Sequence, residues 1–155
     1  MSSLVDSTLA MREFDFWLGS WDLTWEPSGR AVNQVTAILD DRVILERFDG
    51  RPSIPLQGVS LSVYDGEISR WRQTWMDNRA GFLDFVGGME GERMVLERST
   101  AQGVRQRMVW FDVEPEALRW SWERSDDGGT SWNVLWAIRY RRRGFDVSPR
   151  GPSSF

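Results

Sequence analysis

The sequence contains no cysteine, no histidine and no lysine, and all 19 of its basic residues are arginine. Without cysteine the chain has no disulfide, no thiolate nucleophile and no sulfur ligand for zinc or an iron–sulfur cluster. Without histidine and lysine it lacks the usual general base near pH 7, the commonest metal ligand and a Schiff-base amine. We therefore expect no metal or organic cofactor. The chemistry that remains belongs to carboxylates, hydroxyls, arginine, amides and indoles, which makes catalysis less expected than binding.

The chain also lacks a long apolar run, and no stretch approaches the ~18 residues that a membrane-spanning helix needs. Its first residues show no basic and then apolar regions of a secretory signal, so we expect a cytoplasmic protein without a membrane partner. The formal net charge of −4 argues against nucleic acid as a partner. Four arginines at 139 and 141–143 are the local exception, and a solvated strand end is their favoured interpretation over a phosphate-binding patch. The oligomeric state stays open, with a homodimer as one alternative.

The stretch from Phe14 to Trp25 organises the rest of the chain. It begins with a cluster of aromatic residues, turns at Gly19, and then alternates Trp21, Leu23 and Trp25 with polar residues. Period-two alternation predicts a strand with one wet face and one buried face. The residues before it predict a flexible start and then a short helix that ends near residue 18.

Turn signals at a near-regular spacing of about ten residues divide the remaining chain into short strands. We predict ten strands, at residues 20–26, 30–39, 43–48, 56–64, 67–76, 82–89, 92–99, 104–112, 118–125 and 131–142. No helix is long enough for a crossover, so the strands are expected to be antiparallel and to close into a barrel that has no free edges. The prediction is one all-β domain over residues 1–143, followed by a flexible tail over 144–155.

Tryptophans at every second position show which strand faces are buried, because their alternate neighbours are polar. Side chains fill a barrel of about eight strands, so ten strands should leave a lumen. Core packing explains most of the indoles by itself, but a few polar groups among aromatics is also typical of a ligand pocket. The predicted ligand-binding residues are Trp71, Gln73, Trp75, Trp120, Trp122, Trp136, Glu46 and Arg107. The connection over residues 51–55 is the predicted lid.

Residues Ser125 to Trp132 match the Asp-box hairpin, Ser-x-Asp-x-Gly-x-Thr-Trp, with Ser131 in place of the threonine. Asp127 is expected to accept backbone N–H bonds, and Trp132 to pack back under the turn. We interpret this motif as structural. The adjacent pairs 126–127 and 40–41 are not expected to form a catalytic dyad, since they lie in turns and neighbouring residues point apart.

Residues 14–142 resemble bacterial lipocalin-like domains of the calycin superfamily. The resemblance is carried by Phe14 to Asp22, by Trp75-Met76-Asp77 before a glycine turn, and by Ser125 to Trp132. It implies a ten-stranded antiparallel up-and-down calycin barrel with a helical plug and one internal cavity. It also implies that Trp21 lies at the closed end, clamped by an arginine from the last strand. Arg142 is the choice by parity, because it shares a face with Trp136 and Tyr140. Nitrobindin-type haem barrels share this opening, but their iron takes a histidine.

The sequence predicts a binding barrel for a small, apolar or aromatic molecule. An alternative is an enzyme of the cyclase or isomerase type that uses Glu46, Asp77 or a tyrosine as acid or base. A third hypothesis is a protein–protein interaction module with a filled barrel. Haem is not expected, since only Tyr64 or Tyr140 could replace the missing histidine. A buried carboxylate that faces a cavity would favour the enzyme.

Overall fold

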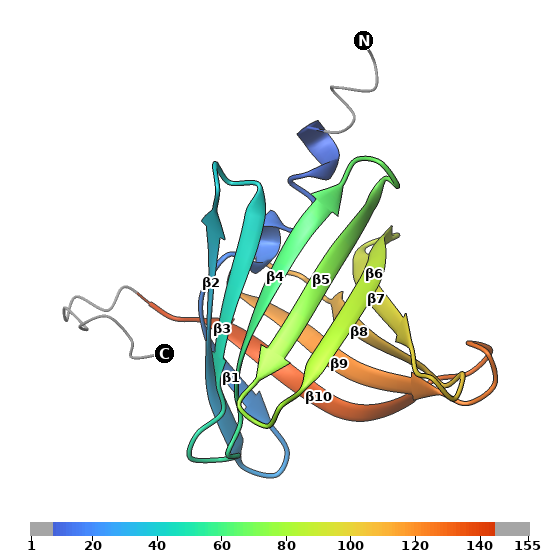
Figure 1. Ribbon diagram of the computed structural model, residues 1–155. Helices are drawn as coiled ribbons and strands as arrows, with labels where there is room; N and C mark the ends of the chain where they lie inside the picture. Colours follow the sequence, from blue (N-terminus) through green and yellow to red (C-terminus); the bar gives the residue numbers. More distant parts are fainter. Residues whose placement is uncertain (1–7, 145–155) are drawn as a thin grey trace.

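Ten antiparallel strands close into one barrel in the computed structural model, which describes residues 8–144 (Figure 1). They are β1 (Gly19–Trp25), β2 (Gly29–Ile38), β3 (Val43–Asp49), β4 (Gln57–Asp65), β5 (Arg70–Asp77), β6 (Phe82–Glu90), β7 (Arg93–Ser99), β8 (Arg105–Phe111), β9 (Ala117–Ser125) and β10 (Asn133–Arg142). Each strand pairs with the next, and β10 pairs with β1. The predicted all-β up-and-down barrel is confirmed. The predicted flexible start, over its first seven residues, and the predicted tail beyond residue 144 lie outside the described residues.

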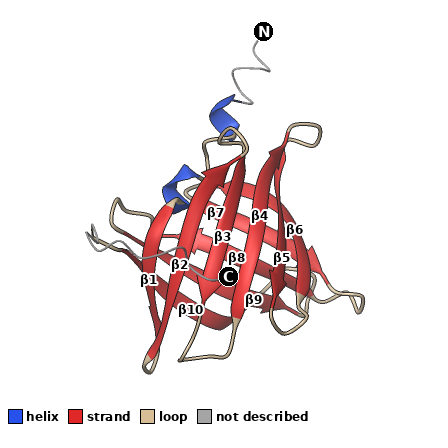
Figure 2. Cartoon of the chain, turned by 60° about the vertical axis from the view of Figure 1, so that its left-hand side comes forward, coloured by secondary structure: helices blue, strands red, loops and turns tan. Residues whose placement is uncertain are grey.

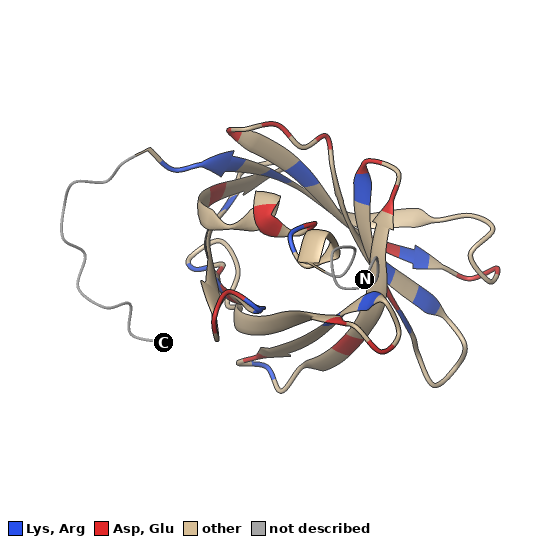
Figure 3. Cartoon of the chain, turned by 90° about the horizontal axis from the view of Figure 1, so that it is seen from above, with Lys and Arg blue, Asp and Glu red and all other residues tan. Residues whose placement is uncertain are grey.

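The N-terminal segment covers one end of the barrel. Residues 8–10 are helical and lead through a turn into the 3-10 helix η1 (Asp15–Trp17). Figures 2 and 3 show this segment at one end of the ring of strands, at the end where β1 begins. Phe14 and Trp17 enter the barrel, stack on each other at 4.8 Å, and meet Trp110 edge-on at 4.9 Å and 5.3 Å. We call the end that these rings fill the plug half, and the other end the mouth half.

Arg142 locks the plug to the first and last strands. Its guanidinium lies 4.2 Å from the ring of Trp21, a cation–π contact, and donates hydrogen bonds to the carbonyl oxygens of Leu18 at 2.7 Å and Pro115 at 3.1 Å. The indole of Trp21 in turn donates to the Trp17 carbonyl at 2.8 Å. Gly19 has a φ of +135°, and a Cβ there would lie 2.3 Å from the Arg142 guanidinium. The glycine in the opening stretch is therefore required both by its backbone angle and by this arginine.

Strand parity settles which polar residues face inward. In β3, Glu46 is buried and Arg47 is exposed, so the carboxylate faces the interior. In β8 the interior takes Met108 and Trp110, and Arg107 consequently points outward. Arg107, one of the predicted ligand-binding residues, therefore does not line the lumen. Sequence alternation left β8 ambiguous, because apolar residues at 108–111 follow one another without a polar break.

Arg107 has a structural partner on the outer wall instead. Its guanidinium lies 2.7 Å from a carboxylate oxygen of Glu123 on β9, and 3.9 Å from the ring centre of Trp132. The Asp-box turn is held as expected, since Asp127 accepts bonds from the Ser131 backbone N–H at 2.9 Å and from the Ser125 hydroxyl at 2.7 Å. These hydrogen bonds, that from the Ser131 hydroxyl first, lower the pKa of Asp127 to about 2. Trp132 thus fastens the turn to the outside of the barrel, away from the lumen.

Within the described part of the chain, no helix is long and apolar enough to span a membrane.

Candidate functional site

A cavity of about 240 Å³ occupies the mouth half of the barrel. Its wall is mostly aromatic and aliphatic, and the lining residues are Glu46, Phe48, Leu56, Trp75, Leu83, Phe85, Met108, Trp110, Trp120, Trp122, Trp136, Ile138 and Tyr140. An apolar cavity of about 150 Å³ is large enough for benzene, so this one has room for a single aromatic ring with a short side chain. A concave, mostly apolar space with a few polar groups is the usual form of a small-molecule site.

The aromatic wall is built from edge-to-face contacts, some between neighbouring strands and some across the lumen. Trp136 of β10 meets Trp120 of β9 at 5.7 Å and Phe48 of β3 at 6.3 Å between ring centres. Across the lumen, Phe85 of β6 meets Trp122 of β9 at 5.9 Å between ring centres. The four tryptophans nearest the mouth, Trp75, Trp120, Trp122 and Trp136, are only partly buried, in contrast to the fully buried rings of the plug half.

Trp75 is positioned by a turn at the mouth. Its indole N–H donates to Asp77 at 2.8 Å, and the same carboxylate accepts the backbone N–H groups of Arg79 at 2.8 Å and Gly81 at 2.9 Å. Burial acts to raise the pKa of Asp77, but these hydrogen bonds outweigh it and lower the pKa below its ordinary value. Because its oxygens are engaged in this turn, Asp77 is poorly suited to the acid–base role predicted as an alternative. It orients a wall residue of the cavity instead.

One polar cluster lies at the inner end of the cavity. Glu46 accepts a hydrogen bond from the Ser60 hydroxyl at 2.7 Å and another from the Asn33 amide at 2.7 Å. The same amide nitrogen donates to the Tyr140 hydroxyl at 3.0 Å. Strands β2, β3, β4 and β10 each contribute one of these four side chains, which are all buried. Because β2, β3 and β4 follow one another in the barrel wall and β10 is separated from β2 by β1 alone, the wall itself fixes the geometry of the cluster.

Burial determines the protonation of this cluster. Glu46 is 7% exposed, and desolvation raises its pKa to about 7, although the hydrogen bonds from Ser60 and Asn33 act in the opposite direction. Burial, reinforced by the charge of Glu46, raises the pKa of Tyr140 well above its ordinary value. Tyr140 therefore stays neutral, whereas Glu46 exchanges a proton near neutral pH.

The structure brings most of the predicted ligand-binding residues together. Trp75, Trp120, Trp122, Trp136 and Glu46 line the cavity. Trp71 and Gln73 are buried inside the barrel but do not line it. Trp71 packs against the plug residue Phe14, and Gln73 donates to the Ser62 hydroxyl at 2.9 Å. The predicted lid, residues 51–55, connects β3 to β4 at the mouth, and the next residue, Leu56, lines the cavity.

Sequence reasoning missed Asn33, Ser60 and Tyr140 as partners of Glu46. Asn33 lies between Ala31 and Val35 on the alternating buried face of β2, so a polar residue at a core position was the available signal. Ser60 gave no such signal, because serine is common at both buried and exposed strand positions. Only the closed barrel brings residues 33, 46, 60 and 140 side by side.

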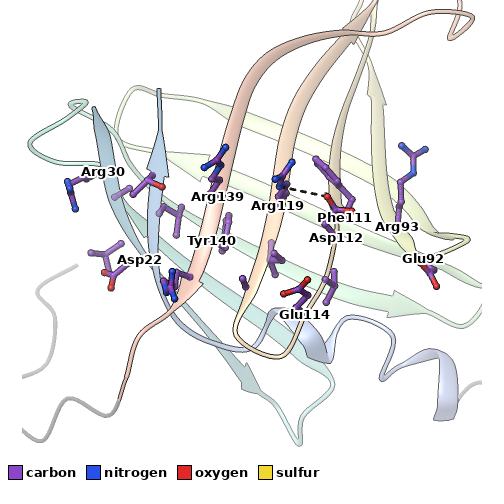
Figure 4. Close-up of a pocket in the computed structure, with 18 of the residues that line it drawn as sticks. Asp22, Arg30, Glu92, Arg93, Phe111, Asp112, Glu114, Arg119, Arg139 and Tyr140 are labelled. Carbon is purple, nitrogen blue, oxygen red and sulfur yellow. Dashed lines mark ion pairs between the residues drawn. The ribbon is translucent and has the colours of Figure 1, made fainter. Parts of the chain in front are cut away.

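A second, larger hollow of about 1390 Å³ lies on the outer surface of the barrel (Figure 4). Arg139 pairs in register with both Thr24 and Arg119, and Thr24 pairs with Arg30, so three arginines form a row across neighbouring strands. These arginines are exposed, and their charges remain in water, where Arg119 lies 3.8 Å from Asp112. The internal cavity is the better candidate site, because its lining is mostly aromatic and aliphatic and lies inside the barrel, whereas this hollow is lined by exposed charged side chains on the outer face.

Haem does not fit the residues that would have to hold it. Tyr140 lines the cavity, but its hydroxyl accepts a hydrogen bond from Asn33 and its raised pKa opposes the phenolate form that iron requires. Tyr64 contacts Trp71 in the plug half and does not line the cavity. Among residues 8–144, no group of three or more acidic side chains is placed to hold a metal ion.

Comparison with models of known protein families finds no match, and comparison with curated proteins finds none either. The closed ten-stranded antiparallel barrel is compatible with a lipocalin-like architecture. A barrel fold does not determine a function, which depends on the residues of the site.

Proposed function

We propose that the protein is a lipocalin-like binding barrel that holds one small, mainly apolar or aromatic molecule in its internal cavity. The observation that carries the proposal is the cavity of about 240 Å³, walled by four partly buried tryptophans with Glu46 as its buried polar anchor. Binding of this kind needs no cofactor. We propose that the protein is located in the cytoplasm. The cavity also argues against the filled-barrel interaction module.

Size and surface chemistry support a small ligand. Burying an aromatic ring removes on the order of 150–250 Å² from water, and each Å² of apolar surface contributes about 25 cal/mol. The gross gain is therefore several kcal/mol, from which the loss of ligand freedom must be subtracted. An affinity in the micromolar to millimolar range is expected for a ligand of one ring.

Calorimetric titration with 2-phenylethanol, a neutral one-ring probe, tests the proposal. The wild-type protein should show saturable binding. Leu83→Trp, which adds an indole inside the cavity, should abolish it, whereas Leu61→Trp on the exposed outer face should leave it intact. No saturable heat at millimolar probe, together with no co-purified small molecule in native mass spectrometry, would overturn the proposal.

A second candidate function, a cofactor-independent enzyme, is favoured by one specific observation. Glu46 faces an apolar cavity, and burial brings its pKa to about 7, close to the value that suits a general base at neutral pH. A generic probe of such a base is the ring opening of 5-nitrobenzisoxazole. There the carboxylate would take the proton from the ring carbon while the N–O bond breaks and a cyanophenolate leaves. A rate that rises through pH 7 and is lost in Glu46→Gln would support the enzyme. A rate equal to that of the variant would exclude this role.

A further inference from the structure

The titratable side chains that line the cavity are acidic. Glu46 and Tyr140 are the titratable residues in its lining, and no arginine lines it within the part of the chain that the structure describes. The hydrogen-bond donors to the Glu46 carboxylate are neutral, the Ser60 hydroxyl and the Asn33 amide. When Glu46 is ionised, its negative charge therefore has no cationic partner inside the barrel among residues 8–144. A buried charge without such a partner is costly, and a ligand that supplies the opposite charge relieves that cost.

The cluster also has more acceptors than donors. A carboxylate offers about four acceptor positions, and the protein fills one on each oxygen of Glu46. The side-chain oxygen of Asn33 is buried and has no hydrogen-bond partner among the described residues. An ammonium group carries three N–H donors and no acceptor, which complements such a cluster. An alcohol would satisfy fewer of these acceptors, and a carboxylate ligand would add another negative charge.

The remaining wall suits the same class of ligand. Trp75, Trp120, Trp122 and Trp136 surround the cavity that ends at Glu46. Tryptophan is the side chain whose ring face attracts cations most strongly, and aromatic walls beside a carboxylate stabilise an ammonium ion after it has lost its water. The same rings pack against the apolar part of the molecule.

We propose that the ligand of this barrel is a small aromatic or aliphatic amine, which binds as its ammonium ion paired with Glu46. This inference rests on the proposed function, because it names the class of molecule that occupies the same cavity. The ammonium lies against the Glu46 carboxylate, and the hydrocarbon part lies between the tryptophans toward the mouth.

Protons compete with the amine for Glu46. The side chains that contact this carboxylate are Ser60 from β4 and Asn33 from β2, and Tyr140 from β10 joins them through Asn33. Tyr140 is the titratable member of this set and stays neutral. Amine affinity should therefore rise with pH through neutrality, as Glu46 loses its proton, until the ligand itself deprotonates.

Three probes that share a phenyl ring and a short chain test the inference by calorimetry at pH 8. They are 2-phenylethylamine, a cation, 2-phenylethanol, which is neutral, and 3-phenylpropionate, an anion. The amine should bind at least tenfold more tightly than the alcohol, and the anion most weakly. Lowering the pH to 6 should reduce the amine affinity severalfold and leave the alcohol affinity unchanged.

Two carboxylate variants complete the test. In Glu46→Gln the amine should bind no more tightly than the alcohol, because the negative charge is gone. Glu123→Gln removes a buried carboxylate on the outer wall, so the preference for the amine should survive. Equal affinities of amine and alcohol in the wild type would overturn the amine inference and leave the binding barrel standing. Failure of all three probes to bind would overturn both.

Discussion

In the plug half of the barrel Phe14, Trp17 and Trp71 are at most 2% exposed, whereas in the mouth half Trp75 and Trp136 are only partly buried around an open cavity. Both halves use aromatic residues with the same period-two spacing. The difference comes from the N-terminal segment, which enters at one end only and fills that end with Phe14 and Trp17. A ten-stranded barrel is wider than the side chains of its own strands can fill. In this protein the N-terminal segment fills only the plug half, and the cavity remains in the mouth half.

The two halves also contribute differently to the free energy of folding and of ligand binding. In the plug half the aromatic side chains are buried against one another, and this burial stabilises the fold. In the mouth half the apolar wall of the cavity stays in contact with solvent until a ligand covers it. Glu46 lies at the inner end of the cavity, where it carries a buried charge that the fold alone does not neutralise.

Truncating a tryptophan should cost far more in the plug half than in the mouth half. Trp17→Ala should lower the free energy of unfolding by about 3–5 kcal/mol, because it leaves a cavity among fully buried rings. Trp136→Ala should cost about 1–2 kcal/mol, since its ring is partly exposed already. Urea unfolding measures both. Equal losses would contradict the division of the barrel into a packed half and a hollow half.

Stability should fall as the pH rises from 4.5 to 7 because of Glu46. Its pKa is raised from 4.5 to about 7 by folding, so in this range the folded protein holds a proton that the unfolded chain has released. The free energy of unfolding should decrease across the window, by about 3 kcal/mol at most for this group. The decrease should be absent in Glu46→Gln, which should be the more stable protein at pH 8. Parallel pH curves of wild type and variant would show that the carboxylate is not desolvated.

Arg142→Ala should loosen the plug. It removes the cation–π contact with Trp21 and the hydrogen bonds to the Leu18 and Pro115 carbonyls, with a combined loss of about 2 kcal/mol. The neighbouring Arg141 is exposed on the outer face, and Arg141→Ala should change stability by less than about 0.5 kcal/mol. Thermal unfolding of the two variants side by side decides the matter, and indistinguishable midpoints would be incompatible with the clamp.

Two aspartates in turns at the mouth should differ in their effect on binding. Asp77→Ala frees the Trp75 indole, which lines the cavity, and should weaken 2-phenylethanol binding severalfold. Asp127→Ala disrupts a turn fastened to the outer wall, so it should lower the unfolding temperature without altering affinity. Calorimetric titration of the folded variants separates them. If Asp127→Ala abolished binding in a protein that stays folded, the Asp-box turn would not be purely structural.

Much of the fold followed from the sequence, because turn signals and period-two alternation are local properties. All ten predicted strands are present, with ends within three residues of the predicted ones. Glycine at 19 and the aromatic cluster before it also gave the correct position of the plug. These features are determined by the backbone and by neighbouring residues, which a single sequence displays directly.

The site was predictable only in part, since it depends on parity and on contacts between distant strands. Arg107 was placed inside because the apolar run at 108–111 hides the alternation of β8. Trp71 and Trp75 share one face of β5 and look alike in sequence, yet the first packs against Phe14 and the second lines the cavity. The polar cluster around Glu46 includes Tyr140 of β10, which is far along the chain from β2, β3 and β4, and periodicity carries no information about which distant strands meet.

The division between a packed plug half and a ligand-binding mouth half is tested most directly by fluorine NMR of the protein labelled with 5-fluorotryptophan. Each of the ten tryptophans then reports separately during a titration with 2-phenylethanol, after assignment by Trp→Phe variants. We expect saturable shifts of Trp75, Trp120, Trp122 and Trp136, with one common dissociation constant, while the resonances of Trp17, Trp21 and Trp71 stay fixed. Unchanged mouth resonances at millimolar ligand, or equal shifts of the plug tryptophans, would contradict it.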